Sequence, residues 1–450
     1  MRIPLWLLLL VALTVHLTAG AQEWEQVELP DGPGDGRPVL LDIAMDGGVV
    51  WFSTLSDAIM GYDGANWVLH TTDDGGIRSN RFRYVMFVDA AGDKWTAKDG
   101  SSTIDRLEDG GTFALKDDDT WSYYSYPSQL ASKRVFSMVE DADGNKWFGI
   151  RDESGTQSSM IELLVENGLG TEDDEWFPFG DSFEPGIFTS EDVRGLELDA
   201  RERLWIVYDR AGVDVWDYGD YTITDDDTLT HYGATEGLPS DAVRALRSGP
   251  DGRMWLGGDN GIAVFEPESG TWTQVAGFPS DRVNDIATDA QGHVWAATDD
   301  GVVMLYASGE IAQHYDSSDG LEDDATIMIA VDQTDGTVWA VTEDQSTSET
   351  YLNVLESGFG PEARVFVYPN PYREGETAER GVIILGAPEG SNVEVFDITG
   401  QSVRELPARR EPFRWDSLDA DLNEVPSGVY IVRVETPSGE VLFTKVAVIR

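Results

Sequence analysis

Cysteine is absent from the 450 residues of this chain, which excludes disulfide bonds, thiolate metal sites and a cysteine nucleophile. Basic residues are scarce: 31 lysines and arginines stand against 83 aspartates and glutamates, and the formal net charge is −52. Nucleic acid and anionic membranes bind cationic surfaces, so we expect neither of them as a partner. Hydrophobic residues make up 41% of the chain, a share that excludes wholesale disorder despite the charge.

Long hydrophobic runs are missing too, except for one at the amino terminus. Residues 5–15 are largely apolar, Arg2 precedes them, and the small residues Ala19-Gly20-Ala21 follow. This order is typical of a secretory signal peptide, so we expect residues 1–21 to be a cleaved signal. No later stretch approaches the roughly 18 apolar residues of a membrane span. We therefore expect a mature chain without a transmembrane segment, secreted or held at the outer cell surface.

A repeated pattern organises the middle of the chain: a hydrophobic stretch, an Asp/Gly turn, and a tryptophan followed by small or apolar residues. The fullest copy reads as four short strands, 242–246, 254–257, 262–265 and 271–275, separated by turns. Four antiparallel strands per copy are typical of a propeller blade, and no sustained 3.6-residue period favours a helical solenoid. The tryptophans recur at intervals of 40 to 58 residues, at Trp51, Trp95, Trp147, Trp205, Trp255, Trp295 and Trp339.

These copies predict an all-β fold with a seven-bladed β-propeller over residues 22–356. We expect the repeated tryptophans to fill the core between blades rather than to bind sugars. The last copy lacks a fourth strand, whereas residues 24–27 (WEQV) resemble the fourth-strand residues 272–275 (WTQV). The amino-terminal strand is therefore expected to complete the seventh blade and cover an exposed edge. The turn at 200–203 lacks the usual glycine, and we expect that hairpin to be looser.

Three stretches carry a family resemblance. They are GLPSDAVRAL at 237–246, DGRMWLGGDNGIAVFE at 251–266 and DADGNKWFGI at 141–150. On these residues the chain resembles the two-component regulator propeller family. The resemblance implies a propeller of a kind that often forms the extracellular sensing half of signalling receptors, frequently for glycans. Because no membrane span or kinase follows the repeats here, we expect a free-standing exported relative.

A different pattern follows a linker at 357–364. Short hydrophobic segments separated by turns predict a small Ig-like β-sandwich over residues 365–450. Its motifs are YPNP at 368–371, VFDITG at 395–400, Trp415-Asp416 and SGVY at 427–430, before a basic end.

These motifs resemble the carboxy-terminal sorting domain of the type IX secretion system, and also the Ig-like domain of flagellar hook-capping proteins. The resemblance implies export across an outer membrane, with the type IX secretion machinery as a partner. The alternative is a plain adhesive Ig-like module. The residues that carry the sorting motif are Tyr368, Pro369, Asn370, Pro371, Gly400, Gly428, Tyr430 and Lys445.

Candidate ligand-binding residues lie where each predicted blade begins. Ligands of propellers usually meet the face formed by the loops that join one blade to the next. Arginine recurs there in a chain poor in basic residues and is suited to acidic sugars or carboxylates. The alternative is that these arginines pair with neighbouring aspartates across blades. The candidates are Arg81, Arg134, Arg194, Asp241, Arg244, Arg282 and Asn284.

Evidence for metal binding or catalysis is weak. The acidic clusters are expected to form a solvated surface, and no cofactor is expected. Asp141, Asp143 and Asn145 resemble the opening of a calcium loop but lack the distal glutamate, so calcium is kept as the alternative. No HExxH or Gly-x-Ser-x-Gly motif occurs, and no pair of carboxylates stands out for glycoside hydrolysis.

The sequence therefore favours an exported, non-catalytic propeller that binds polysaccharide or protein. One alternative is a propeller-type lyase acting on a polysaccharide or lactone, because the repeat also resembles streptogramin lyase-like propellers. Such an enzyme would need a histidine or tyrosine base in the central face. Another alternative is a structural or adhesive component of the cell envelope.

Overall fold

The computed structural model has two β domains joined in one chain. Its described residues are 23–30, 37–55, 59–74, 77, 82–98, 103–110, 113, 116–125, 133–152, 161–166, 174–180, 188–190, 193–218, 227–267, 269–357, 365–368, 372–373, 381–385, 387, 390–406, 413–421, 423–437 and 441–450. The predicted signal peptide, 1–21, lies outside them.

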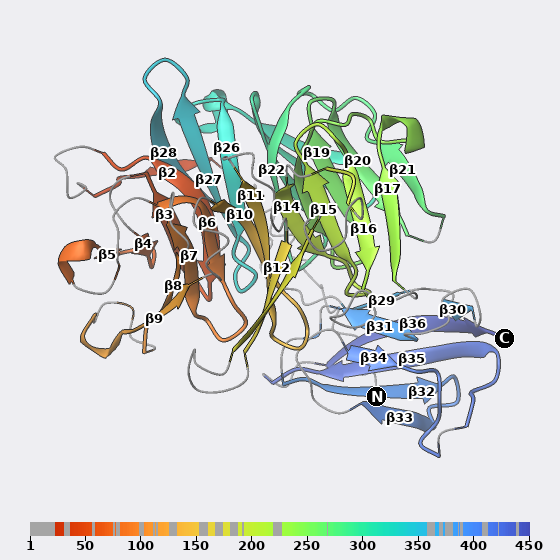
Figure 1. Ribbon diagram of the computed structural model, residues 1–450. Helices are drawn as coiled ribbons and strands as arrows, with labels where there is room; N and C mark the ends of the chain where they lie inside the picture. Colours follow the sequence, from red (N-terminus) through yellow and green to blue (C-terminus); the bar gives the residue numbers. More distant parts are fainter. Residues whose placement is uncertain are drawn as a thin grey trace, which may run out of the picture.

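Blades 1 to 4 are four-stranded antiparallel sheets built from consecutive strands (Figure 1). Blade 1 contains β2 (Leu40–Asp46), β3 (Val49–Thr54), β4 (Ile59–Tyr62) and β5 (Trp67–His70). Blade 2 contains β6 (Phe82–Val88), β7 (Lys94–Lys98), β8 (Thr103–Glu108) and β9 (Thr120–Ser125). Blade 3 contains β10 (Lys133–Glu140), β11 (Lys146–Asp152), β12 (Ile161–Val165) and β13 (Glu175–Phe179). Blade 4 contains β14 (Val193–Leu198), β15 (Leu204–Tyr208), β16 (Val213–Asp217) and β17 (Thr228–Tyr232).

Blades 5 to 7 complete the ring. Blade 5 contains β18 (Val243–Ser248), β19 (Met254–Gly258), β20 (Gly261–Glu266) and β21 (Thr271–Gln274). Blade 6 contains β22 (Val283–Thr288), β23 (Val294–Thr298), β24 (Gly301–Leu305) and β25 (Ile311–Tyr315). Blade 7 contains β26 (Thr326–Val331), β27 (Thr337–Asp344), β28 (Glu349–Glu356) and the amino-terminal β1 (Glu25–Val27). Short 3₁₀ turns connect some strands: η1 (Thr72–Asp74), η2 (Lys116–Asp118), η3 (Ala234–Glu236) and η4 (Ser317–Asp319).

The ring is closed at both its inner and its outer radius. Each innermost strand contacts the innermost strand of the next blade, and β26 contacts β2. At the outer radius, β1 pairs antiparallel with β28, with Glu25 opposite Val354. Trp24 is 3% exposed and packs edge to face on Tyr315 of blade 6, with ring centroids 6.0 Å apart. The two ends of the propeller therefore share one sheet, which leaves blade 7 no missing strand.

The repeated tryptophans lie on the second strand of each blade and are at most 5% exposed. In blades 2, 3, 4 and 6 the indole Nε1 donates to an aspartate six residues earlier, in the turn between the first two strands. The other oxygen of that aspartate accepts backbone N–H groups of the same turn, as Asp89 does from Ala91 and Asp93. One carboxylate thus shapes the turn and satisfies the buried indole. The pairs are Asp89–Trp95, Asp141–Trp147, Asp199–Trp205 and Asp289–Trp295, at 2.9, 3.2, 2.9 and 3.4 Å.

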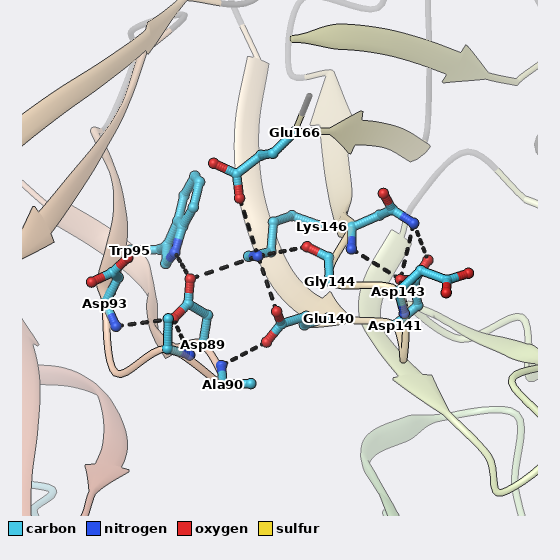
Figure 2. A network of polar contacts seen from close by, with 12 residues as sticks. Asp89, Ala90, Asp93, Trp95, Glu140, Asp141, Asp143, Gly144, Lys146 and Glu166 are labelled. Carbon is cyan, nitrogen blue, oxygen red and sulfur yellow. Dashed lines mark hydrogen bonds and ion pairs between the residues drawn. The ribbon is translucent and has the colours of Figure 1, made fainter. Parts of the chain in front are cut away.

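Buried lysines join adjacent blades (Figure 2). The side chain of Lys146 is 3% exposed, and its Nζ lies 3.1 Å from Glu140 and 3.3 Å from Glu166 in blade 3. The same Nζ lies 3.6 Å from Asp89 of blade 2 and 5.5 Å from the ring centre of Trp95. A buried ammonium is tolerated only where carboxylates surround it, and here those carboxylates come from two blades.

Lys94 makes the equivalent contact one blade earlier. Its side chain is 1% exposed, and its Nζ lies 2.5 Å from Asp46 of blade 1 and 2.7 Å from Asp109 of blade 2. The ammonium also lies 5.1 Å from the ring centre of Trp51, on the neighbouring blade. Lys94 and Lys146, two of the few cations of this acidic chain, are therefore buried inside the ring, where they connect blades 1 to 3.

The carboxy-terminal domain is a sandwich of two sheets. One sheet has the order β29 (Phe366–Tyr368), β31 (Val382–Leu385) and β34 (Phe413–Trp415). The other has the order β30 (Tyr372–Arg373), β36 (Val441–Ile449), β35 (Gly428–Glu435), β32 (Asn392–Asp397) and β33 (Ser402–Leu406). Alternate residues of both sheets form one core that includes Val382, Ile384, Phe413, Trp415, Tyr430 and Val432. This arrangement agrees with the predicted Ig-like sandwich.

The closing strand yields a stability prediction. Trp24→Ala removes a buried ring where β1 meets blade 6, and we expect the free energy of unfolding to fall by about 3–5 kcal/mol. Glu25→Ala on the same strand alters an exposed side chain and keeps the backbone pairing, so its effect should stay within about 0.5 kcal/mol. Chemical denaturation of both variants measures the difference, and similar losses would contradict a closing role for Trp24.

Candidate functional site

A cavity of about 630 Å³ lies at the centre of the ring, and the innermost strands of all seven blades line it. Each of these strands contains a register shift in its pairing with the second strand. In six blades the shift leaves a single residue unpaired, and each of those residues lines the cavity: Leu41, Phe136, Arg194, Arg244, Asn284 and Ile327. A β-bulge re-aims a side chain, so the bulges present these six residues at equivalent positions of the wall.

The polar members of this set come from three adjacent blades. Blades 4, 5 and 6 supply Arg194, Arg244 and Asn284, which we call the polar arc, whereas blades 1, 3 and 7 supply apolar residues. Each member of the arc contacts an aspartate in the loop between the second and third strands of its own blade. The atom pairs are Arg194 Nη1–Asp209 Oδ1 at 3.9 Å, Arg244 Nε–Asp259 Oδ1 at 2.7 Å and Asn284 Nδ2–Asp299 Oδ1 at 2.8 Å.

The alternative raised by the sequence is that these arginines pair with aspartates of neighbouring blades, and the ion pairs described above differ from it. The aspartates that hold Arg194 and Arg244 belong to the same blade, not to a neighbouring one, because the loop between strands 2 and 3 lies at the end of the sheet where strand 1 begins. Asn284 also reaches across blades, because its amide donates to the carbonyl of Thr326 in blade 7 at 2.9 Å.

The other described candidates are not among the residues that line the cavity. Arg282 precedes β22, and its Nη1 lies 3.6 Å from Asp299, the aspartate that also contacts Asn284. Arg134 lies in β10, two residues before the bulge residue of blade 3. Asp241 accepts the backbone N–H of Ala234 at 2.6 Å and so holds the turn that leads into blade 5. Arg81 lies outside the described residues.

Beyond the arc, the cavity wall carries four charged residues that the sequence did not single out. The Nη1 of Arg247 lies 3.3 Å from the Glu197 carboxylate, and its Nε donates to the carbonyl of Ile286 at 3.0 Å. The four residues are Asp42, Glu197, Arg247 and Asp285. Three carboxyl groups and one guanidinium therefore share this confined space.

Asp42 and Asp285 satisfy backbone groups at the inner edge of the ring. Asp42 Oδ2 accepts the N–H of Met86 in blade 2 at 2.7 Å, and Asp285 Oδ2 accepts the N–H of Ile329 in blade 7 at 3.0 Å. Innermost strands have no sheet partner on the cavity side, so these carboxylates replace a missing ladder bond. Ser137 Oγ does the same for Leu196 at 2.9 Å.

Burial governs the protonation of these acids. It raises the pKa of Asp42 to about 7, although the N–H groups of Met86 and Ile43 and the charge of Arg247 lower it, and the charge of Asp285 raises it further. Burial also raises the pKa values of Asp285 and Glu197, against the lowering effect of Arg247. Asp42 is partly buried in the cavity wall, and burial disfavours the charged form of its carboxyl group.

The calcium candidates lie in the turn between β10 and β11. Asp141 Oδ1 accepts the backbone N–H groups of Asp143 and Asn145 at 3.0 and 2.9 Å, and Oδ2 accepts Trp147 Nε1. Asp141 therefore occupies the turn position shared with Asp89, Asp199 and Asp289. Within the described part of the chain, no three acidic or histidine side chains are grouped as metal ligands.

His231 pairs with a buried aspartate. Its Nδ1 lies 2.7 Å from the carboxylate of Asp214, which is fully buried and also accepts the hydroxyl of Tyr208 at 2.8 Å. Thr189 donates its hydroxyl to the same carboxylate at 2.7 Å. The pair lies on the two outer strands of blade 4, away from the cavity, and no histidine is among the described residues that line it.

The sorting-motif residues spread through the sandwich. Tyr430 is 4% exposed, its hydroxyl donates to the carbonyl of Pro426 at 2.7 Å, and its ring packs edge to face on Trp415. Gly400 adopts φ 83° in the turn between β32 and β33, a conformation that favours glycine. Tyr368 ends β29, Gly428 begins β35 and Lys445 lies in β36. Pro369, Asn370 and Pro371 lie outside the described residues.

The pKa of Asp42 yields a prediction about pH. Since the folded protein retains this proton up to about pH 7 while the unfolded chain loses it near pH 4, the contribution of Asp42 to stability should be lost as the pH rises through that window. Chemical denaturation at pH 5 and pH 8 should show the unfolding free energy of the native protein falling relative to Asp42→Asn by about 1–3 kcal/mol. A difference that stays constant between the two pH values would contradict the protonation of Asp42.

The turn at Asp141 yields a second prediction. Asp141→Ala leaves the turn N–H groups and the buried indole of Trp147 without their acceptor, so the unfolding free energy should fall by about 2–4 kcal/mol. If the carboxylate serves only the fold, about 5 mM calcium, above the range of extracellular calcium modules, should leave the melting temperature of the native protein unchanged. A calcium-induced rise that disappears in Asp141→Ala would instead establish a metal site.

Comparison with known proteins finds a family match within each domain. Residues 366–449 match the family model described as the secretion system C-terminal sorting domain, and residues 277–300 match the two component regulator propeller. None of the curated proteins matches the sequence. The described residues contain no helix that could span a membrane.

Solved structures that share the fold include the following two. PorZ of Porphyromonas gingivalis, described as an essential bacterial surface component of its type-IX secretion system, matches with a TM-score of 0.57 and 20% identity. The match covers 94% of this chain but 61% of PorZ, so this chain spans about three fifths of that protein. An inactive variant of virginiamycin B lyase from Staphylococcus aureus, solved with quinupristin, matches with a TM-score of 0.53 and 14% identity, over 74% of this chain and 99% of the lyase.

These identities establish the shared fold alone. The family match at the carboxy terminus also indicates where the protein is located, because such a domain directs its protein out of the cell. The chain is therefore a β-propeller that matches the two component regulator propeller over residues 277–300, followed by a domain that matches the secretion system C-terminal sorting domain, and it is exported to the cell surface or beyond.

Proposed function

We propose that this exported propeller is a non-catalytic binding protein that takes a carboxylate-bearing polysaccharide or protein segment at the polar arc. The observation that carries the proposal is the placement of Arg194, Arg244 and Asn284 at equivalent bulge positions of three adjacent blades, on the wall of one cavity. Three donors at one level of the wall offer a ligand several hydrogen bonds at once.

The ion pairs of Arg194 and Arg244 are compatible with binding a ligand carboxylate. Asp209 and Asp259, their partners, have side chains that are 40% and 43% exposed, and ion pairs of that kind contribute little to stability. The close contact of Arg244 engages Nε, whereas the two terminal nitrogens of a guanidinium carry four further N–H donors. A ligand carboxylate can use such a fork in bidentate fashion.

The charge of the chain limits the form of the ligand. With a formal net charge of −52, the protein repels polyanions at long range. At physiological ionic strength this field is screened beyond about 8 Å, so an acidic group already at the arc is governed by its near neighbours. We therefore expect a ligand that presents one or a few carboxylates to the cavity rather than a polyanion spread over the surface.

The lyase alternative needs a base near the bound ligand. His231, paired with buried Asp214, is a candidate base by its chemistry, but it lies on the outer strand β17 rather than at the cavity. Cleavage of a ligand that is lost in His231→Ala would favour the lyase. A structural or adhesive role would be favoured if no soluble ligand binds.

A thermal-shift screen against acidic and neutral polysaccharides tests the proposal. A ligand that binds only the folded state raises the unfolding free energy, by about 2.7 kcal/mol at 100 times its Kd. We expect an acidic ligand to raise the melting temperature of the native protein, with at least a tenfold loss of affinity in Arg194→Ala and Arg244→Ala.

Arg433→Ala provides the matched control, because it removes an arginine in the carboxy-terminal sandwich that is paired with Glu435 at 2.7 Å. This variant should bind like the native protein. Equal losses in all three variants, or binding that survives both arc variants, would place the ligand elsewhere.

A further inference from the structure

The turn between β14 and β15 has a different amino acid from its counterparts at one position. In blades 2, 3, 5 and 6 a glycine occupies the left-handed position of this turn, with φ between 81° and 87°, at Gly92, Gly144, Gly252 and Gly292. Blade 4 has Glu202 there, at φ 63°. Side chains rarely adopt this conformation, so a glutamate in it calls for a compensating contact.

The turn itself keeps its form. Glu202 N donates to the carbonyl of Asp199 at 2.8 Å, as Gly144 N does to Asp141 at 2.9 Å. The looser hairpin expected from the missing glycine is therefore not observed. The side chain, not the backbone, distinguishes this turn from the others.

The carboxylate of Glu202 faces two ways. Its Oε2 accepts the N–H of Ala142, in the turn of blade 3, at 3.0 Å. Its Oε1 lies 3.7 Å from Nη2 of Arg414, which belongs to β34 of the carboxy-terminal domain. One side chain of blade 4 therefore contacts both blade 3 and the sandwich.

An apolar contact lies beside this ion pair. Ala200, in the same turn, packs against Ile383 of β31, and the two residues are 7% and 1% exposed. Ile383 and Arg414 lie directly opposite one another on β31 and β34. Their strand neighbours Val382, Ile384, Phe413 and Trp415 point into the core of the sandwich.

The alternation of side chains along a strand thus puts Ile383 and Arg414 together on the outer face of the three-stranded sheet. In Figure 1, β29 and β31 lie on the side of the sandwich nearest the propeller, together with β30 and β36 of the other sheet. The propeller buries an isoleucine that the sandwich core does not use, next to the arginine that pairs with Glu202.

We infer that the turn of blade 4 is a docking site for the sorting domain, in which a glutamate replaces the usual glycine so that it can hold Arg414 while Ala200 covers Ile383. The sorting domain is then presented in one orientation, with the three-stranded sheet against the propeller and the five-stranded sheet outward. Phe443 and Val429 of that outward sheet are 63% and 45% exposed.

Engineered cysteines test the docking, because the full chain has none of its own. Ala200→Cys with Ile383→Cys should form an intramolecular disulfide under mild oxidation, visible as a mobility shift on a non-reducing gel. The control pair, Ala200→Cys with Phe443→Cys, should not cross-link. A properly folded first pair that fails to cross-link, or cross-linking of both pairs at the same rate, would overturn the docking.

Two charge variants, each made in the cross-linking pair, test the role of the glutamate. Glu202→Gln keeps an acceptor for Ala142 but removes the charge that faces Arg414, and Arg414→Gln removes the partner. Each should slow cross-linking by roughly two- to fivefold, as expected for a partly exposed ion pair, and the double variant should be no slower than either. Arg433→Gln should leave the rate unchanged. A rate that is insensitive to Glu202 and Arg414 would overturn the proposed function of this ion pair.

Discussion

Four of the seven blades share one contact, in which the aspartate that shapes the first turn accepts the indole N–H of the buried tryptophan on the second strand. An acceptor for a buried indole N–H avoids the cost of an unsatisfied donor, and in these blades the aspartate provides it without a separate polar side chain in the core. In blade 5 glycine takes this position, at Gly249, and Arg253 instead lies over Trp255 while pairing with Asp251 at 2.6 Å. Other blades add inter-blade charges, such as Lys146 over Trp95.

The packing around the tryptophans also positions the innermost strands at the centre of the ring. Because the blades pack against one another through the tryptophans, their first strands surround a cavity. Some backbone N–H groups of these strands face the cavity and have no neighbouring strand to pair with. Asp42 and Asp285 supply the missing acceptors, and their confinement favours the protonated carboxyl. The bulge before each of these positions aims one side chain into the cavity. In blades 4 to 6 these side chains are polar, and they form the arc.

Much of the fold could be predicted from the chain because the repeat carries its own physical reasons: Trp205 or Trp295 marks a second strand, and an Asp/Gly turn precedes it. The arc was partly predictable, since Arg194 and Arg244 stand at strand entries in a chain poor in basic residues. Asp42 and Asp285 were missed, because an acid within an inner strand looks like another surface carboxylate until the ring closes. The contact between Glu202 and Arg414 joins residues far apart in sequence, so the only local signal was the missing glycine.

The central claim is that the polar arc recognises carboxylates. The most direct measurement is calorimetric titration of the full chain with an acidic oligosaccharide and with the methyl ester of the same oligosaccharide. These two ligands differ only in the methyl group that removes the negative charge of each carboxylate. The account predicts one site per chain, with the acid binding at least tenfold more tightly than the ester. Equal affinities, or several equivalent sites per chain, would contradict it.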